Sequence, residues 1–143
     1  MLSVNPSKHL TPFLLAGLCL LTVLVYFPGL SGDYMFDDMP NLLQNSRLQV
    51  DTLDMESLVS AAYSSGSGLL RRPVSMATFA LNHYFFGANP FSYKVINLMV
   101  HLMTGMALFW LATLIVKHYR RHCEPSLPPA VETWLPLAVC ALW

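Results

Sequence analysis

The chain has 143 residues, of which 55% are hydrophobic and only 11% are charged, whereas about 25% of the residues in soluble globular proteins are charged. Eight Lys and Arg residues balance eight Asp and Glu residues, so no net field recruits a nucleic acid and we expect no such partner. The excess of apolar residues instead predicts an all-α membrane protein.

A first transmembrane helix is expected near residues 12–30. No Asp, Glu, Lys or Arg occurs between His9 and Gly32, and an apolar run of this length meets the requirement of ~20 residues for crossing a bilayer. Cleavage as a signal peptide is the alternative. It is disfavoured because Leu30 stands where signal peptidase sites carry a small residue.

Two adjacent carboxylates, Asp37 and Asp38, follow this span closely. One could act as a base and the other as an orienting group or metal ligand. Mutual repulsion, with partial burial under Met35 and Phe36, would raise the pKa of one carboxylate, and a divalent cation would have the reverse effect. Alternatively, the pair caps a helix that starts near Pro40, and the spacing leaves both interpretations open.

Two helices are expected in the segment that follows. Asp51 is placed to cap the first helix. The apolar residues of this helix recur at the spacing of one helical face: Met55, Leu58, Val59 and Ala62. The second helix is expected over residues 74–86. Pro73 suits its first turn, and Gly87 ends it. We expect this second helix to lie along the membrane surface.

Arg71 and Arg72 precede the second of these helices. A guanidinium group presents a rigid fork of donors that matches phosphate oxygens, so both are candidate ligands of a phosphate or pyrophosphate headgroup. Snorkelling at the membrane interface explains them equally well.

A second transmembrane helix is expected near residues 95–116, which carry no charge. Its polar residues recur at intervals of three and four and share one stripe: Lys94, Asn97, His101 and Thr104. Such a stripe normally faces other helices or a wet cavity. His101 is a candidate substrate-binding residue, with a packing role as the alternative.

The distribution of basic residues predicts the orientation of this helix pair. Lys117, Arg120 and Arg121 follow the second span directly, and Lys8 precedes the first. The positive-inside rule then places both ends of the pair in the cytoplasm and the long segment 31–94 on the extracytoplasmic side. We expect a multi-pass protein of the bacterial inner membrane, or of the endoplasmic reticulum in a eukaryote, with a cytoplasmic N-terminus.

The last apolar segment, residues 133–143, is too short to cross a bilayer and is expected to be the start of a third span. Residues 1–143 would then be the truncated N-terminal part of a polytopic membrane domain, with 31–94 as its first extracytoplasmic loop. The spacing of the cysteines suggests neither a zinc site nor a disulfide framework, so we expect free thiols at Cys19, Cys123 and Cys140.

Three strings in this order resemble the transmembrane and tetratricopeptide-repeat O-mannosyltransferase family and its bacterial relatives, within the GT-C superfamily of glycosyltransferases. They are YMFDD at 34–38, RPVSMATF at 72–79 and NPFSYKVINLMVHL at 89–102. The arrangement of one span, an acidic pair, a long loop and a second span is also similar.

The resemblance implies an enzyme that transfers a sugar from a polyprenyl-phosphate carrier to a hydroxyl of a protein or glycan on the extracytoplasmic side. Membrane lipids, the lipid-linked donor and the acceptor are the implied partners. The acidic pair at the active site of such enzymes corresponds to Asp37 and Asp38, one of which would be the base toward the acceptor hydroxyl. Later loops and tetratricopeptide repeats would follow, so we expect no activity from these residues alone. No cofactor is identified, although a divalent cation is compatible with the pair.

The competing hypothesis is a non-enzymatic membrane scaffold, in which downstream tetratricopeptide repeats assemble components of an envelope or pilus. A transporter, suggested by the polar stripe, ranks third. The apolar runs lack the short, Gly/Pro-interrupted spans that are typical of transporter sites.

Overall fold

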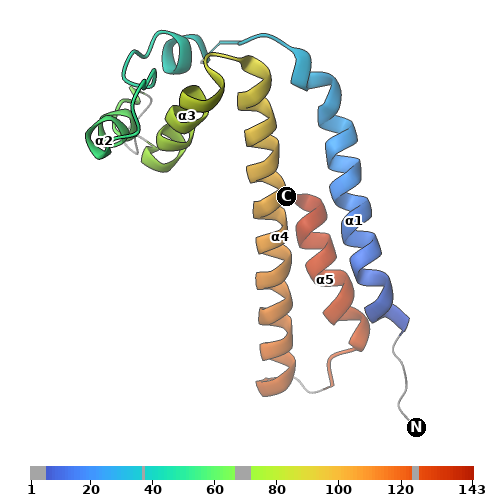
Figure 1. The fold of residues 1–143 in the computed structure, drawn as a ribbon. Helices are drawn as coiled ribbons and strands as arrows, with labels where there is room; N and C mark the ends of the chain where they lie inside the picture. Colours follow the sequence, from blue (N-terminus) through green and yellow to red (C-terminus); the bar gives the residue numbers. More distant parts are fainter. Residues whose placement is uncertain (1–5, 37, 67–71, 124–125) are drawn as a thin grey trace. The chain divides into compact units, whose positions relative to one another are not determined.

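The computed structural model describes residues 6–36, 38–66, 72–123 and 126–143. All regular elements within these ranges are helical and none is a strand, which confirms the all-α prediction. The chain divides into two compact units: a three-helix unit, Met1–Phe27 with Leu98–Trp143, and a loop unit, Pro28–Asn97. Helix α4 (Pro90–His122) contributes to both (Figure 1).

Helix α1 (Pro6–Tyr26) is followed directly by a 3₁₀ turn, η1 (Phe27–Ser31). The stretch Leu10–Ser31 is long and apolar enough to cross a membrane, which agrees with the span expected at 12–30. Pro28 explains the change of helix type, because proline has no N–H to donate to the preceding turn.

Helix α4 is the second element that is long and apolar enough to span a membrane. It extends beyond the expected range of 95–116 at both ends. Pro90 is well suited to the first helical turn, and basic side chains such as Lys117 and Arg120 are good helix formers. With 33 residues the helix is about 50 Å long, more than the ~30 Å of a bilayer's hydrocarbon core. The two candidate spans are compatible with a place in a membrane.

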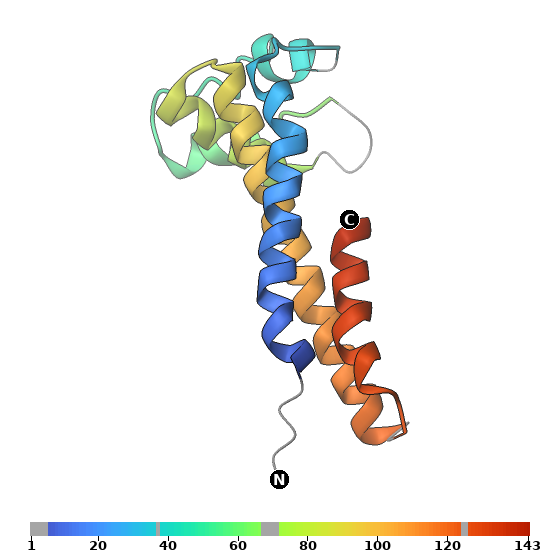
Figure 2. The same cartoon turned by 90° about the vertical axis from the view of Figure 1, so that its right-hand side faces the viewer.

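Helix α5 (Pro129–Leu142) contacts α1 in the three-helix unit (Figure 2). It begins earlier than the start expected near Thr133, because Pro129 can occupy the first turn. At 14 residues it is about 21 Å long, which is shorter than the hydrocarbon core. A third span therefore stays a prediction.

In the loop unit, helix α2 (Met55–Ala62) is capped by Asp54 and not by Asp51 as expected. Asp54 immediately precedes the first helical residue in an extended conformation, and its carboxylate accepts a hydrogen bond from the N–H of Ser57 at 2.8 Å. Asp51 lies three residues too early for this contact. The expected apolar face is also only partly right, because Met55 and Val59 are exposed and Ala61 is the fully buried residue.

Helix α3 (Pro73–Phe86) coincides with the helix expected at 74–86, and Gly87 ends it with φ of 67°. A left-handed residue at this point favours glycine. The helix packs against α2. Its position relative to a membrane surface remains a prediction.

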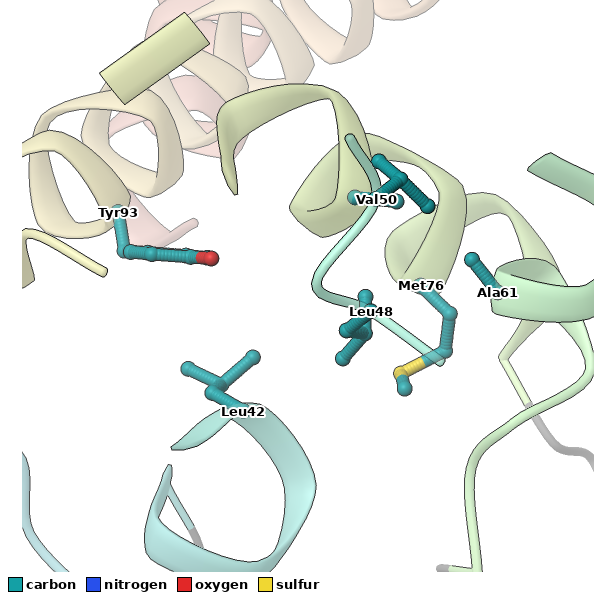
Figure 3. Close-up of a cluster of buried hydrophobic side chains, with 7 residues drawn as sticks. Leu42, Leu48, Val50, Ala61, Met76 and Tyr93 are labelled. Atoms are coloured by element: carbon teal, nitrogen blue, oxygen red, sulfur yellow. The ribbon is translucent and has the colours of Figure 1, made fainter. Parts of the chain in front are cut away.

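The loop unit has its own hydrophobic core (Figure 3). The core brings together side chains from the segment before α2, from α2 and α3, and from the first turns of α4: Leu42, Leu48, Val50, Ala61, Met76, Ala80 and Tyr93. Burying such side chains is the main source of stability for a unit of this size. Three of these residues, Leu42, Met76 and Tyr93, also line the cavity described next.

Candidate functional site

A cavity of about 270 Å³ lies in the loop unit. It combines one carboxylate, two cationic groups and two tyrosines with apolar residues of the core. Its polar and charged lining residues are Tyr34, Asp38, Asn41, Ser65, Arg72, Ser75, Tyr93, Lys94 and Asn97. The cavity is therefore suited to a ligand that carries both hydroxyl groups and negative charge.

Asp38 is the carboxylate of this cavity. It precedes a π-helical turn, η2 (Met39–Leu43), but its side chain makes no capping hydrogen bond to that turn. Its Oδ2 atom instead accepts a hydrogen bond from the N–H of Met35 at 3.2 Å. The capping interpretation thus does not apply to Asp38, whereas Asp37 lies outside the described residues.

The backbone on either side of Asp38 is unusual. Phe36 has φ of 43°, a left-handed conformation that costs a non-glycine residue about 1–2 kcal/mol. The turn after Asp38 closes with a hydrogen bond from the N–H of Gln44 to the carbonyl of Met39, the spacing of a π turn. Strained residues and π turns are found preferentially at functional sites. Met35 and Phe36, the residues expected to cover a carboxylate of the pair, are themselves exposed, whereas Asp38 is half-buried.

Arg72 contributes a guanidinium group to the cavity. It also has a left-handed backbone, with φ of 41°, and it immediately precedes Pro73 at the start of α3. Helical conformations are disfavoured before proline, so this backbone too is strained. Arg71, the other predicted phosphate ligand, lies outside the described residues.

Tyr34 and Tyr93 form an edge-to-face pair, with ring centroids 6.1 Å apart. The hydroxyl oxygen of Tyr34 is buried and has no hydrogen-bond partner among the described residues. Burial, and secondly the negative charge of Asp38, raise the pKa of Tyr34 above its usual value. Its hydroxyl therefore remains protonated at neutral pH and can donate to a ligand.

The polar stripe predicted on the second span divides between the two units. Lys94 and Asn97 line the cavity. His101 belongs to the three-helix unit, where its ring lies against Tyr26 and stacks on Trp143, both at centroid distances of 5.7 Å. These contacts favour the packing alternative for His101, and its substrate-binding role stays an untested prediction.

Sequence reasoning did not identify Tyr34 or Tyr93 as site residues, although both lie inside the strings that carry the family resemblance. Among the described residues, no three His, Cys, Asp or Glu side chains gather as metal ligands. Cys19, Cys123 and Cys140 are free thiols, as predicted.

Curated proteins with similar sequences are protein O-mannosyl-transferases. Tmtc3 of Drosophila melanogaster is 24% identical over 133 residues, 90% of this chain. TMTC4 of Homo sapiens is 29% identical over 107 residues, 68% of the chain, and TMTC2 of Mus musculus is 31% identical over 88 residues, 57% of the chain. These matches confirm the resemblance to the transmembrane and tetratricopeptide-repeat O-mannosyltransferases.

The chain spans only 10–14% of the length of these relatives. No protein-family model matches the chain, and no solved structure gives a significant match.

Proposed function

We propose that this chain forms part of a membrane glycosyltransferase, which takes a sugar from a polyprenyl-phosphate carrier and transfers it to a hydroxyl of a protein or glycan. The similarity to protein O-mannosyl-transferases supports sugar transfer as the reaction class. The relatives are much longer than this chain, so parts of a longer protein would complete the donor and acceptor sites.

The observation that carries this proposal is the presence of Asp38 and Arg72 in one cavity. A glycosyl phosphate donor needs a cation at its phosphate, and an acceptor hydroxyl needs a base. The cavity volume of about 270 Å³ is slightly below the ~300–1,000 Å³ of typical ligand pockets. It would therefore accommodate the reacting groups and leave the polyprenyl chain outside.

In the proposed step, the carboxylate of Asp38 accepts the proton of the acceptor hydroxyl. The acceptor oxygen forms a bond to the anomeric carbon of the sugar, and the bond between that carbon and the phosphate oxygen breaks. The bonding electrons leave with the polyprenyl phosphate, whose charge the guanidinium of Arg72 stabilises. Asp37 is the second member of the acidic pair and would orient its neighbour or bind a cation.

We further propose that the loop unit faces the extracytoplasmic side, in the bacterial inner membrane or the endoplasmic reticulum, with the N-terminus in the cytoplasm. The basic residues at the end of α4, among them Arg120 and Arg121, support this orientation. In a variant whose three native cysteines are replaced by serine, the substitution Ser46→Cys, at an exposed position of the loop unit, should give labelling by a membrane-impermeant thiol reagent from outside. Labelling only from the cytoplasmic side would contradict the orientation.

The reaction is tested with the full-length protein in lipid nanodiscs, polyprenyl-phosphate-linked radioactive mannose and a peptide rich in serine and threonine. We expect radioactivity to pass to the peptide, and addition of EDTA shows whether a divalent cation takes part. No transfer from mannosyl or other polyprenyl-phosphate sugars, together with a stable co-purifying envelope or pilus protein, would favour a scaffold instead.

A further inference from the structure

The ammonium group of Lys94 lies among main-chain carbonyl oxygens of the loop unit. Its Nζ atom donates hydrogen bonds to the carbonyls of Gly29 at 3.1 Å, Gly32 at 2.5 Å and Asp33 at 3.3 Å. An ammonium group has three protons, and the three carbonyls use all of them. In this arrangement Lys94 has no proton left for a phosphate, although it lines the same cavity as Asp38.

These carbonyls belong to the end of η1 and to the segment that leads from it to the acidic pair. Lys94 is separated from them by 61 to 65 positions in the sequence, so the hydrogen bonds join two distant parts of the loop unit. Only the Gly29 carbonyl belongs to η1 (Phe27–Ser31), where it also accepts a hydrogen bond from the N–H of Gly32 at 3.3 Å. A cation near the last carbonyls of a helical turn is favoured. Lys94 therefore adds a donor at the end of η1 and restrains the two residues beyond it, Gly32 and Asp33.

Gly32 lies directly against the ammonium group of Lys94. A Cβ atom at this position would lie 2.9 Å from Nζ of Lys94, closer than side-chain atoms normally approach one another. A side chain at residue 32 would therefore make the ammonium group shift, which the end of a flexible lysine side chain can do. Gly32 thus leaves room for the ammonium group beside its own carbonyl.

We propose that Lys94 is a positioning residue of the transfer reaction, which holds residues 29–33 so that Asp38 faces the cavity, and that it is not a ligand of the donor phosphate. The assignment of a reaction to the cavity rests on the proposed function. In this arrangement Arg72 supplies the cation that faces the donor, and Lys94 fixes the segment that carries the base. Loss of Lys94 should then affect catalysis more than donor binding.

The kinetic test compares Lys94→Met and Gly32→Ala with the wild-type full-length protein in nanodiscs. Because a displacement of about 1 Å can cost 10²-fold in rate, we expect Lys94→Met to lower kcat on the order of 100-fold, with the KM for the polyprenyl-phosphate sugar changed by less than about threefold. Gly32→Ala should act in the same direction as Lys94→Met: it should lower kcat and leave KM nearly unchanged. Lys117→Met, at an exposed lysine of the same helix, is the matched control.

A second readout does not depend on activity. Hydrogen exchange of the backbone amides at residues 29–36 should be about tenfold faster in Lys94→Met than in the wild type, because three hydrogen bonds that restrain the segment are lost. If the wild-type protein transfers no sugar, the proposed function fails, and this exchange measurement alone decides whether Lys94 restrains the segment. Unchanged exchange, or a KM raised tenfold with kcat retained, would overturn the assignment.

Discussion

The guanidinium of Arg120 lies 2.8 Å from the carboxylate of Glu132. Arg120 is in the last turn of α4 and Glu132 is in the first turn of α5. Each charge thus also lies at the helix end whose dipole favours it. The basic residues that follow the second apolar run therefore serve in part to join two helices of the three-helix unit.

This ion pair should make only a small contribution to stability. The side chains of Arg120 and Glu132 are 36% and 18% exposed, and partly exposed pairs contribute less than about 1 kcal/mol. We expect Arg120→Gln and Glu132→Gln each to lower the free energy of unfolding by less than ~1 kcal/mol, with no further loss in the double variant. Unfolding in detergent measures this, with Arg121→Gln as control. A loss of several kcal/mol would contradict it.

Asp54 should make the stability of α2 depend on pH. Hydrogen bonds from the Thr52 hydroxyl and then from Ser57 lower the pKa of Asp54 from 3.8 to about 2. Because its pKa is lower in the folded state, the stabilisation is complete above the unfolded value of about 3.8 and is lost as the pH falls through about 2. Amide protection factors of α2 should decrease over this range in the wild type.

The matched variants are Asp54→Ala and Asp51→Ala. Removal of the cap should lower the protection factors of α2 severalfold at neutral pH and abolish their acid dependence. Asp51→Ala should behave like the wild type, because Asp51 does not cap the helix. Equal effects of the two variants would contradict the assignment of the cap.

Asn82 should be replaceable by an apolar residue. Its side chain is 1% exposed, and neither its amide nitrogen nor its oxygen has a hydrogen-bond partner among the described residues. An unpaired buried amide costs about 1–3 kcal/mol, so Asn82→Leu should leave the free energy of unfolding unchanged or raise it by up to ~2 kcal/mol. Chemical unfolding of the protein in detergent provides the measurement.

Asn89→Leu is the comparison for this prediction. The side chain of Asn89 accepts a hydrogen bond from the N–H of Phe91 at 3.0 Å, so its loss should destabilise the protein by about 1 kcal/mol. If Asn82→Leu destabilises as much as Asn89→Leu, the amide of Asn82 has a partner and the prediction is wrong.

Arg72→Gln should weaken the binding of the polyprenyl-phosphate sugar. A neutral amide cannot replace a guanidinium at a phosphate, so we expect the KM for the donor to rise on the order of tenfold. Steady-state kinetics measure the effect, and Arg47→Gln, at an exposed arginine of the loop unit, is the control. An unchanged KM would remove Arg72 from the donor site.

The sequence predicted those parts of the fold that depend on local properties. The two candidate spans follow from the length of uncharged apolar runs. Helix α3 follows from Pro73 at its start and Gly87 at its end, because the conformational preferences of these residues hold in any environment.

Features that depend on a partner distant in the sequence could not be predicted. The intervals of the polar stripe placed Lys94 and His101 on one helical face, but they could not show that Lys94 binds the carbonyls near Gly32 or that His101 stacks on Trp143. Likewise, the choice between Asp51 and Asp54 as cap depends on where the helix begins, which apolar periodicity leaves uncertain by a few residues.

The decisive measurement is the rate of sugar transfer from polyprenyl-phosphate mannose to a serine- and threonine-rich peptide by the full-length Asp38→Asn variant. An amide cannot accept the proton of the acceptor hydroxyl, so the rate should fall at least ~100-fold, while Asp51→Asn, an exposed residue of the loop unit, retains the wild-type rate. Transfer by Asp38→Asn at the wild-type rate would contradict the role of this carboxylate as the base.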